Sequence, residues 1–404
     1  MDQRRRPRGF GRYWSANTLS AFGTTITAVA LPVLVVDVLR ADPLQVGLVG
    51  AAQFLPYAVL GLLAGVYVDR WRRRRTLVVA SIGRAVALAA IAAAWALEIL
   101  SVELLIALLL IFGAFSVFGF AAAQSLLPRV VPREDLLRAN ARLDQGEAAA
   151  QTFGPALAGL VVRGLGAPLA LVADAITYVV DAVLVAGLPV DETPVRTRER
   201  LLPAIREGLR ATYRHPVLAP LSLSTHVWFV ANAASLTVLS LLALRTLDLG
   251  AALFGILLSV VGAATLLGAT AAVPAGARFG QGGTIALARI GYPLAWTAAA
   301  LVPAIDRAVG VPLLVVALAL GGVAAGLENA NEMSYRQQVT PDELLGRVNA
   351  TGRAVNRTCA VIGALLGGAT VAAWGVPTAL WAVVTVFTVA ALIAGLTAVR
   401  TARA

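Results

Sequence analysis

The sequence has little of what most soluble chemistry requires. Of its 404 residues one is cysteine (Cys359), two are histidine, and all 33 basic residues are arginine, so lysine is absent. A Walker phosphate-binding loop and a Schiff base each need a lysine, which excludes both. A single cysteine excludes an intrachain disulfide and argues against a structural zinc site. Because no nucleophile–base pair or metal-ligand set is evident either, we predict a protein that is not an enzyme and holds no metal or cofactor.

Charged residues are scarce as well. They make up 14% of the chain, and 59% of the residues are hydrophobic, whereas about a quarter of an ordinary soluble domain is charged. Apolar runs long enough to cross a bilayer recur along the whole chain, which predicts an all-α membrane protein surrounded by lipid. We expect twelve transmembrane helices, at residues 14–39, 46–68, 76–97, 102–124, 146–163, 167–190, 217–243, 251–274, 284–304, 311–333, 350–373 and 376–397.

The placement of arginine predicts the orientation of the chain. With the N-terminus inside, the inner segments hold 25 arginines and the outer loops hold four. Basic loops stay on the cytoplasmic side, so we expect both termini to be cytoplasmic. A bacterial plasma membrane is what the family resemblance described below implies. A net charge of +11 would suggest nucleic acid in a soluble protein. Here the arginines lie between apolar runs, so no nucleic-acid partner is expected.

An internal repeat indicates that the chain has two similar parts. The pattern P-x-E-x-x-x-R-x-N-A begins at Pro132 and recurs, 209 residues later, at Pro341. The same shift carries Gly154 onto Gly363, and a proline suits the start of a helix. Each repeated segment is therefore expected to form a short cytoplasmic helix before the fifth or the eleventh spanning helix. Parallel repeats of this kind relate the two halves of some transporters.

The longest polar segment separates these parts. It covers 191–216, so we expect six-helix, pseudo-symmetric halves at 1–190 and 217–404 with a cytoplasmic linker between them. The middle of the linker, 201–213, could form an amphipathic helix on the inner leaflet.

The turn after the second apolar run carries a signature. It reads Gly65-x-x-x-Asp69-Arg70-x-x-Arg73-Arg74. This resembles the signature between helices two and three of the major facilitator superfamily, except that Arg72 stands where that pattern has glycine. The resemblance implies the major facilitator fold.

Two further motifs resemble exporters of that superfamily. The segment 154–159, GPALAG, is similar to part of the helix-five antiporter signature, and Gln337-x-x-x-Pro341-x-x-Leu344-x-Gly346-Arg347 resembles the loop after helix ten in exporters of the enterobactin-exporter and macrolide-efflux type. The resemblance implies a monomeric secondary active exporter of amphipathic small molecules (drug, antibiotic or siderophore-like), driven by proton antiport. An importer of a small polar solute and a non-transporting membrane sensor or scaffold are the alternatives, and the substrate stays open.

Ionisable residues inside the membrane are costly, so they are candidates for function. In the sixth predicted helix, Asp174, Thr177, Tyr178 and Asp181 share one face because their spacing is i, i+3, i+4 and i+7. Asp174 and Asp181 could carry a proton or could form a buried, hydrogen-bonded pair that only packs helices. Asp37, near the outer end of the first helix, is a third candidate for proton coupling or simply reaches the interface.

Polar residues at equivalent places in the first and seventh helices predict a substrate cavity. A shift of 208 relates the two sets, and interhelical hydrogen bonding is the alternative reading. Phenylalanines of the fourth helix supply an apolar wall or face lipid, and the histidine of the seventh helix packs more plausibly than it carries a proton. The cavity candidates are Asn17, Thr24, Thr27, Phe112, Phe115, Thr225, His226, Asn232 and Ser235.

A charged network is expected at the inner gate. Glu328 and Glu332 share a face of the tenth helix at the depth of Arg353 and Arg357 in the eleventh, so we expect opposite charges to pair there. Asp69 is expected to cap the start of the eleventh helix when the inside is closed. The remaining gate candidates are Gly65, Arg70 and Arg73.

Overall fold

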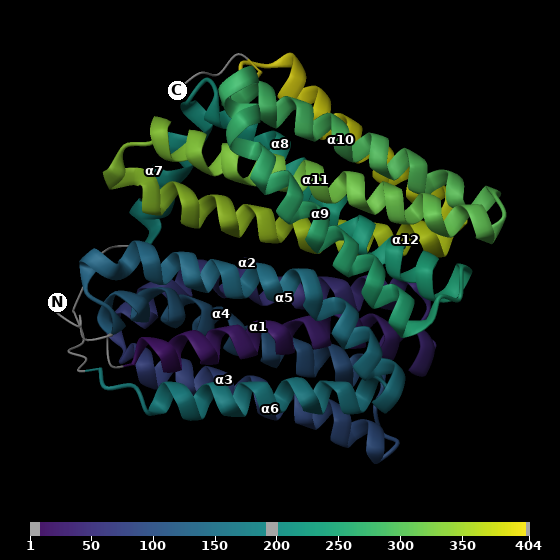
Figure 1. The fold of residues 1–404 in the computed structure, drawn as a ribbon, viewed down its shortest axis with the longest axis horizontal. Helices are drawn as coiled ribbons and strands as arrows, with labels where there is room; N and C mark the ends of the chain where they lie inside the picture. Colours follow the sequence, from purple (N-terminus) through teal and green to yellow (C-terminus); the bar gives the residue numbers. More distant parts are fainter. Residues whose placement is uncertain (1–8, 191–200, 401–404) are drawn as a thin grey trace, which may run out of the picture.

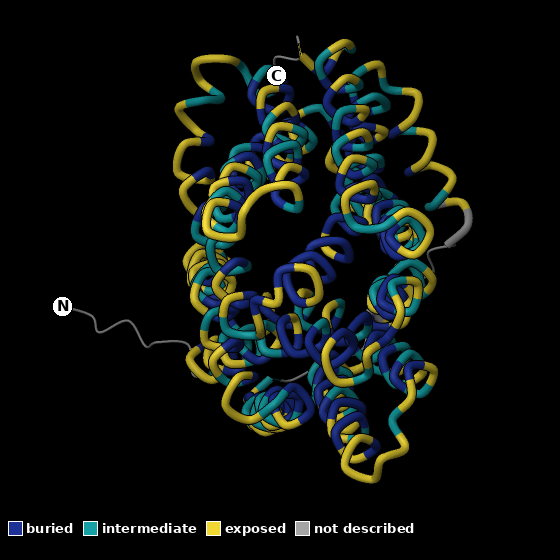
Figure 2. The backbone as a smooth tube through the Cα atoms, turned by 90° about the vertical axis from the view of Figure 1, so that its right-hand side faces the viewer, coloured by how far each residue is buried: buried dark blue, intermediate teal, exposed yellow. Residues whose placement is uncertain are grey.

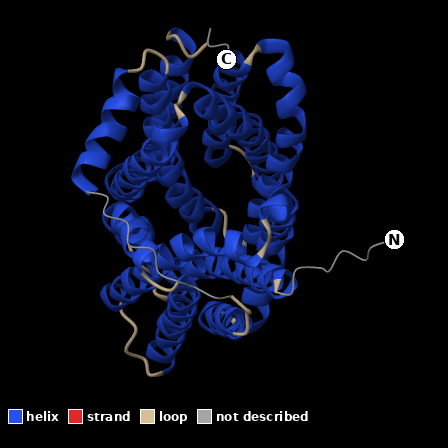
Figure 3. Cartoon of the chain, turned by 90° about the vertical axis from the view of Figure 1, so that its left-hand side faces the viewer, coloured by secondary structure: helices blue, strands red, loops and turns tan. Residues whose placement is uncertain are grey.

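The computed structural model describes residues 9–190 and 201–400, and these ranges contain helices and loops but no strand (Figure 3). The first part holds α1 (Phe10–Val33), α2 (Pro43–Arg70), α3 (Arg73–Ala96), α4 (Val102–Val130), α5 (Leu136–Leu165) and α6 (Ala167–Ala186). The second holds α7 (Leu201–Arg214), α8 (Leu218–Ser240), α9 (Gly250–Phe279), α10 (Gln281–Leu301), α11 (Arg307–Val339) and α12 (Asp342–Leu396). Short π-helical turns, Leu34–Val38 and Leu241–Thr246, continue α1 and α8.

Twelve spans follow from these helices, as predicted. Ten of the described helices are long and apolar enough to cross a membrane. One of them, α12, makes two spans, because Gly375 breaks its helical geometry with φ 81°, a value that favours glycine. The 30-residue α5, whose first turns are charged, supplies the last span. A short 3₁₀ helix, Arg133–Asp135, follows Pro132 and leads into α5, as expected. The segment after Pro341 runs directly into α12, so the separate short helix expected there is wrong.

The spans form two groups that lie side by side (Figure 1). The first group is α1–α6, called the N half below, and the second is α8–α12, called the C half. The start of α1, the end of α12 and the helix α7 all lie at one end, which we call the basic end because it carries the Arg70–Arg75 turn. We call the opposite end the far end. α7 packs on the C half, where Gly208 lies against the backbone of Arg347.

The two halves touch each other mainly toward the far end, through glycines. A Cβ atom on Gly47 of α2 would lie 2.7 Å from the carbonyl oxygen of Ala364 on α12, and one on Gly159 of α5 would lie 2.7 Å from that of Ala251 on α9. Small residues allow such close approach of helices. Nearer the basic end, a Cβ atom added to Gly61 or Gly65 of α2 would have no neighbouring atom within 4 Å. The halves are therefore in close contact toward the far end and less closely packed around Gly61 and Gly65. The largest buried core runs across both halves, for example from Leu34 to Leu242, and Figure 2 shows buried stretches in both groups of helices and in the centre between them.

Candidate functional site

The acidic face of α6 is buried inside the N half, as its spacing predicts. Asp174 has no exposed surface, and Tyr178 and Asp181 are buried beside it. The Asp174 carboxylate accepts a hydrogen bond from the hydroxyl of Thr27 on α1. The Thr177 hydroxyl is shared between the other carboxylate oxygen, at 3.0 Å, and the Asp174 backbone carbonyl, at 2.8 Å. Both of its oxygens are thus held by neutral donors.

Within the described residues, one arginine forms an ion pair with this face of α6, and its partner is Asp181. Arg84 of α3 has its Nη2 atom 3.9 Å from the Asp181 carboxylate and 2.8 Å from the hydroxyl of Ser81, which itself donates to Asp181. The guanidinium lies 4.2 Å from the centre of the Tyr178 ring, a cation–π contact. Within residues 9–190 and 201–400, no basic side chain forms an ion pair with Asp174.

Close packing of α1 on α6 makes the Asp174 site possible. Gly23 faces Asp174 and Thr177 so closely that an added Cβ would overlap both side chains. The next residue, Thr24, has its hydroxyl 3.1 Å from the Tyr178 hydroxyl. Nothing in the sequence marks Gly23 as special, because its role appears only when the two helices are side by side.

The predicted phenylalanine wall faces the protein rather than lipid. Phe112 meets the Tyr178 ring edge-on, with ring centres 6.0 Å apart. Phe115 packs against α3 at Gly83, where no side chain would fit.

The C half holds a second charged cluster, centred on Arg289 of α10, which is 1% exposed. Its guanidinium pairs with Glu328 and, at 3.3 Å, with Glu332, both on α11, and donates to the Thr225 hydroxyl at 3.0 Å. Arg336 pairs with Glu332 from one turn away. Two arginines and two glutamates therefore balance one another.

This arrangement corrects the predicted gate network. Glu328 and Glu332 pair with Arg289 and Arg336, not with Arg353 and Arg357. The reason is direction around the helix, since α11 turns both glutamates toward α10. Arg289, and Arg84 in the N half, could have been predicted as functional candidates. Each is a charged residue inside an apolar run, as Asp174 is.

Arg357 lies instead between the halves. Its guanidinium is 5.7 Å from the ring centre of Phe54 and 5.3 Å from that of Tyr57, both on α2. The side chain is half-buried and that of Arg353 is exposed. Across the described parts of the chain, neither arginine has a carboxylate within ion-pair distance.

The other predicted cavity residues lie outside the two charged clusters. His226 is buried between the Tyr213 hydroxyl and the Asn356 side chain, each 2.6 Å away, as a packing histidine would be. Asn17 and Asn232 are partly exposed, and Ser235 donates to the Asn232 carbonyl of its own helix.

The candidates near the two ends are also placed. Asp37 is exposed at the far end, in the π turn after α1. Arg70 is exposed at the end of α2, whereas Arg73 is buried at the start of α3. The side chain of Asp69 lies outside the described residues, so its capping role stays a prediction.

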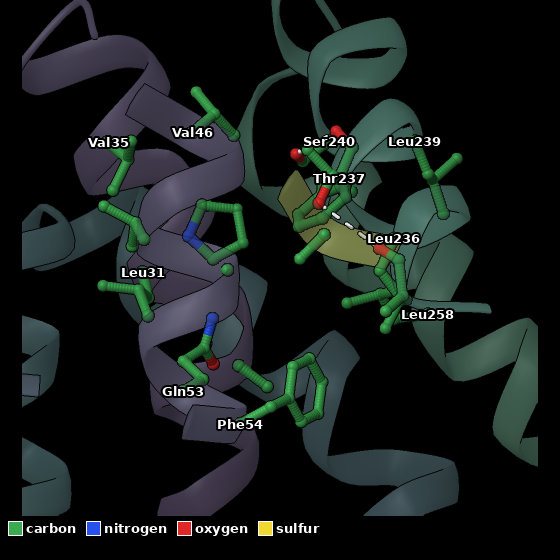
Figure 4. Close-up of a pocket in the computed structure, with 17 residues that line it drawn as sticks. Leu31, Val35, Val46, Gln53, Phe54, Leu236, Thr237, Leu239, Ser240 and Leu258 are labelled. Carbon is green, nitrogen blue, oxygen red and sulfur yellow. Dashed lines mark hydrogen bonds between the residues drawn. The ribbon is translucent and has the colours of Figure 1, made fainter. Parts of the chain in front are cut away.

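A cavity of about 300 Å³ lies between the halves near the far end. Figure 4 shows Leu31, Val35, Val46, Gln53 and Phe54 of α1, its π turn and α2 on one side, and residues of α8 and α9 on the other. None of the nine predicted cavity residues lines it. The full lining is Ala28, Leu31, Pro32, Val35, Val46, Val49, Gly50, Gln53, Phe54, Ala233, Leu236, Thr237, Leu239, Ser240, Phe254, Leu258 and Ala364.

The fold and these sites can be compared with known proteins. A family model described as transmembrane secretion effector, a branch of the major facilitator superfamily, matches residues 6–404. The chain belongs to that family. It is therefore a multi-pass membrane transporter and not an enzyme, and the superfamily resemblance noted in the sequence is confirmed.

Two curated bacterial relatives match most of the chain. The multidrug efflux pump Tap of Mycolicibacterium fortuitum is 28% identical over 391 residues, which cover 90% of this chain and 92% of Tap. The uncharacterized MFS-type transporter YfiS of Bacillus subtilis is 26% identical over 385 residues, covering 92% and 88% of the two chains.

Solved structures share the fold. A bacterial homologue of the iron transporter ferroportin, in its inward-facing state, superposes with a TM-score of 0.76 at 14% identity, covering 96% of this chain and 98% of that one. The outward-facing state of such a homologue gives 0.61 at 15% identity, covering 98% and 99%.

Proposed function

We propose that the protein is a proton-driven exporter of amphipathic small molecules that works by alternating access. The observation that carries the proposal is the Asp174 site, a fully buried carboxylate held by two hydroxyls beside an arginine that is committed to another carboxylate. A buried charge without a counter-ion is costly, so Asp174 is suited to bind a proton during part of the cycle. Asp181, in contrast, holds Arg84 in place.

Asp174 is also placed to link a proton to movement. Its partner Thr27 belongs to α1, whereas Thr177 belongs to α6. Protonation changes which oxygen accepts and which donates, and so changes the contact between these helices. A group that binds a proton more tightly in one conformation than in the other shifts the balance between them.

We infer that the basic end is cytoplasmic, so that the described conformation is inward-facing. The arginine excess at that end supports this orientation, as does the greater similarity to an inward-facing than to an outward-facing homologue. The name of Tap supports export. A cysteine introduced at Asp306, which caps α11 at the far end, in a Cys359→Ala background should react with an impermeant thiol reagent on intact cells. Labelling only after the cells are opened would reject the orientation.

The experiment that tests the function uses inverted membrane vesicles with an acidic interior and a panel of radiolabelled antibiotics and dyes. Wild-type protein should accumulate at least one compound, and an uncoupler should abolish the accumulation. Asp174→Asn should lose gradient-driven accumulation but keep exchange of labelled for unlabelled compound across the membrane. Asp144→Asn, which changes an exposed carboxylate on α5, is the matched control and should behave as wild type. Gradient-driven accumulation at the wild-type level by Asp174→Asn would overturn the proposal.

A further inference from the structure

We propose that the transported compound is an amphipathic organic anion, with its apolar part in the cavity near the far end and its acidic group on Arg357. This inference rests on the transport function proposed above and specifies its substrate class. Phe54 joins the two parts of the site, because it lines the cavity and also contacts the Arg357 guanidinium.

The cavity selects an apolar group. Its lining has no charged side chain, and its polar members are Gln53, Thr237 and Ser240. The two hydroxyls donate to carbonyl oxygens of α8 itself, at 3.3 Å for Thr237 and 2.8 Å for Ser240. Only the Gln53 amide is left to meet a ligand. A volume of about 300 Å³ lies at the small end of ligand sites, which suits one or two fused rings or a short alkyl chain.

Arg357 selects a negative charge. It is half-buried, and within the described residues none of its N–H groups has a hydrogen-bond acceptor. An arginine at membrane depth normally pairs with a carboxylate or a backbone carbonyl. Aromatic rings instead flank the Arg357 guanidinium, which leaves its donors for a ligand. A planar guanidinium can bind a carboxylate or a sulfonate with two parallel hydrogen bonds.

The surrounding charges leave this arginine available. Arg84 is committed to Asp181, and the two glutamates of the C half are committed to Arg289 and Arg336. Arg353, one turn from Arg357 toward the basic end, is exposed and likewise has no carboxylate partner in the described ranges. An anion that enters from the open, basic end therefore meets two arginines in succession before it reaches the apolar cavity.

An anionic substrate also agrees with export. A membrane potential of 100 mV, negative inside, favours outward movement of a monovalent anion by roughly fortyfold. Exchange for protons adds to this force. Asp174 lies on α6 of the N half and Arg357 on α12 of the C half, so we infer that the two sites are coupled through the conformational change.

The test measures binding to the purified, full-length protein in detergent, with no gradient. Three compounds share one ring system and differ in charge: 2-naphthylacetate, its neutral amide, and 2-naphthylethylamine. Wild-type protein should bind the anion at least about tenfold more tightly than the amide, because one charge-assisted hydrogen bond contributes that much to affinity. It should bind the cation most weakly. Arg357→Gln should remove the preference for the anion, and Arg357→Lys should keep most of it. Arg278→Gln is the matched control, because Arg278 also lies over an aromatic ring but is exposed at the end of α9.

A second variant tests the apolar part. Ala28→Phe fills the cavity from α1 and should weaken the anion and the amide by the same factor. Equal affinity of wild-type protein for anion and amide, or an unchanged preference in Arg357→Gln protein that elutes as a monodisperse peak, would overturn the inference. Because binding requires no proton gradient, these results are independent of the vesicle experiment. If wild-type protein binds the anion and the amide equally but shows gradient-driven export, only the substrate class is rejected.

Discussion

The two halves of the molecule repeat one architecture but balance their charges differently. Thr76, Ile82 and Gly83 of α3 recur 208 residues later as Thr284, Ile290 and Gly291 of α10. Each glycine faces the neighbouring helix of its half, against Phe115 on α4 and Ala324 on α11. The π turns that follow α1 and α8 are likewise equivalent. Shape is therefore conserved between the halves.

The charged groups do not follow this symmetry. Arg289 stands at the position of Ser81, and its glutamate partners come from α11, whereas Arg84 finds its aspartate on α6. The C half pairs two arginines with two glutamates, and the N half pairs one arginine with one of two aspartates. In the C half each glutamate of the cluster therefore has an arginine partner. We propose that the excess carboxylate, Asp174, is the group of the N half that binds the coupling proton.

Breaking the balanced cluster should have the largest effect on stability. Arg289→Met leaves Glu328 without an arginine partner, whereas Glu332 keeps Arg336. Removal of one partner from a buried ion pair costs about 3–5 kcal/mol, so the melting temperature in detergent should fall sharply. Adding Glu328→Leu should restore much of the loss, since Glu332 keeps Arg336. A melting temperature equal to that of wild type in the single variant would show that the Arg289 ion pairs do not stabilise the C half.

A larger side chain at the contact between α1 and α6 should lower stability less than Arg289→Met does, but should clearly reduce transport. Gly23→Ala places a methyl group where α1 meets Asp174 and Thr177, and overpacking of this kind costs about 1–3 kcal/mol. The Thr27–Asp174 hydrogen bond should be lost, and gradient-driven transport with it. Gly11→Ala, in the same helix with open space around it, should be neutral or slightly stabilising. Similar melting temperatures and transport rates for the two variants would contradict the tight α1–α6 contact.

Much of the fold could be predicted from the sequence because each part has a local cause. Apolar runs specify the spans, and Pro341 directly precedes the first residue of α12. The spacing of Asp174, Tyr178 and Asp181 predicted their common buried face. The start of α5 was misplaced by ten residues, from 146 to Leu136, because its first turns are polar and helical at once.

The site was harder to predict, because partners depend on which helices become neighbours. The sequence shows that Glu328 is inside the membrane but not that α11 turns it toward Arg289 on α10 instead of Arg357 on α12. Gly23 looks like any glycine of an apolar helix until α6 lies against it. The cavity is lined mostly by small and apolar residues, whereas most of the predicted cavity residues are polar.

The most direct test of the excess carboxylate measures protons instead of substrate. Proteoliposomes with an acidic lumen would contain a trapped pH-sensitive dye, and the compound with the greatest gradient-driven uptake would be added outside. Wild-type protein should let luminal protons leave as the compound enters, so that the luminal pH rises. Asp174→Asn should show no such rise while still exchanging labelled for unlabelled compound. A substrate-dependent rise of the same size in Asp174→Asn would contradict the assignment of Asp174 as the proton carrier.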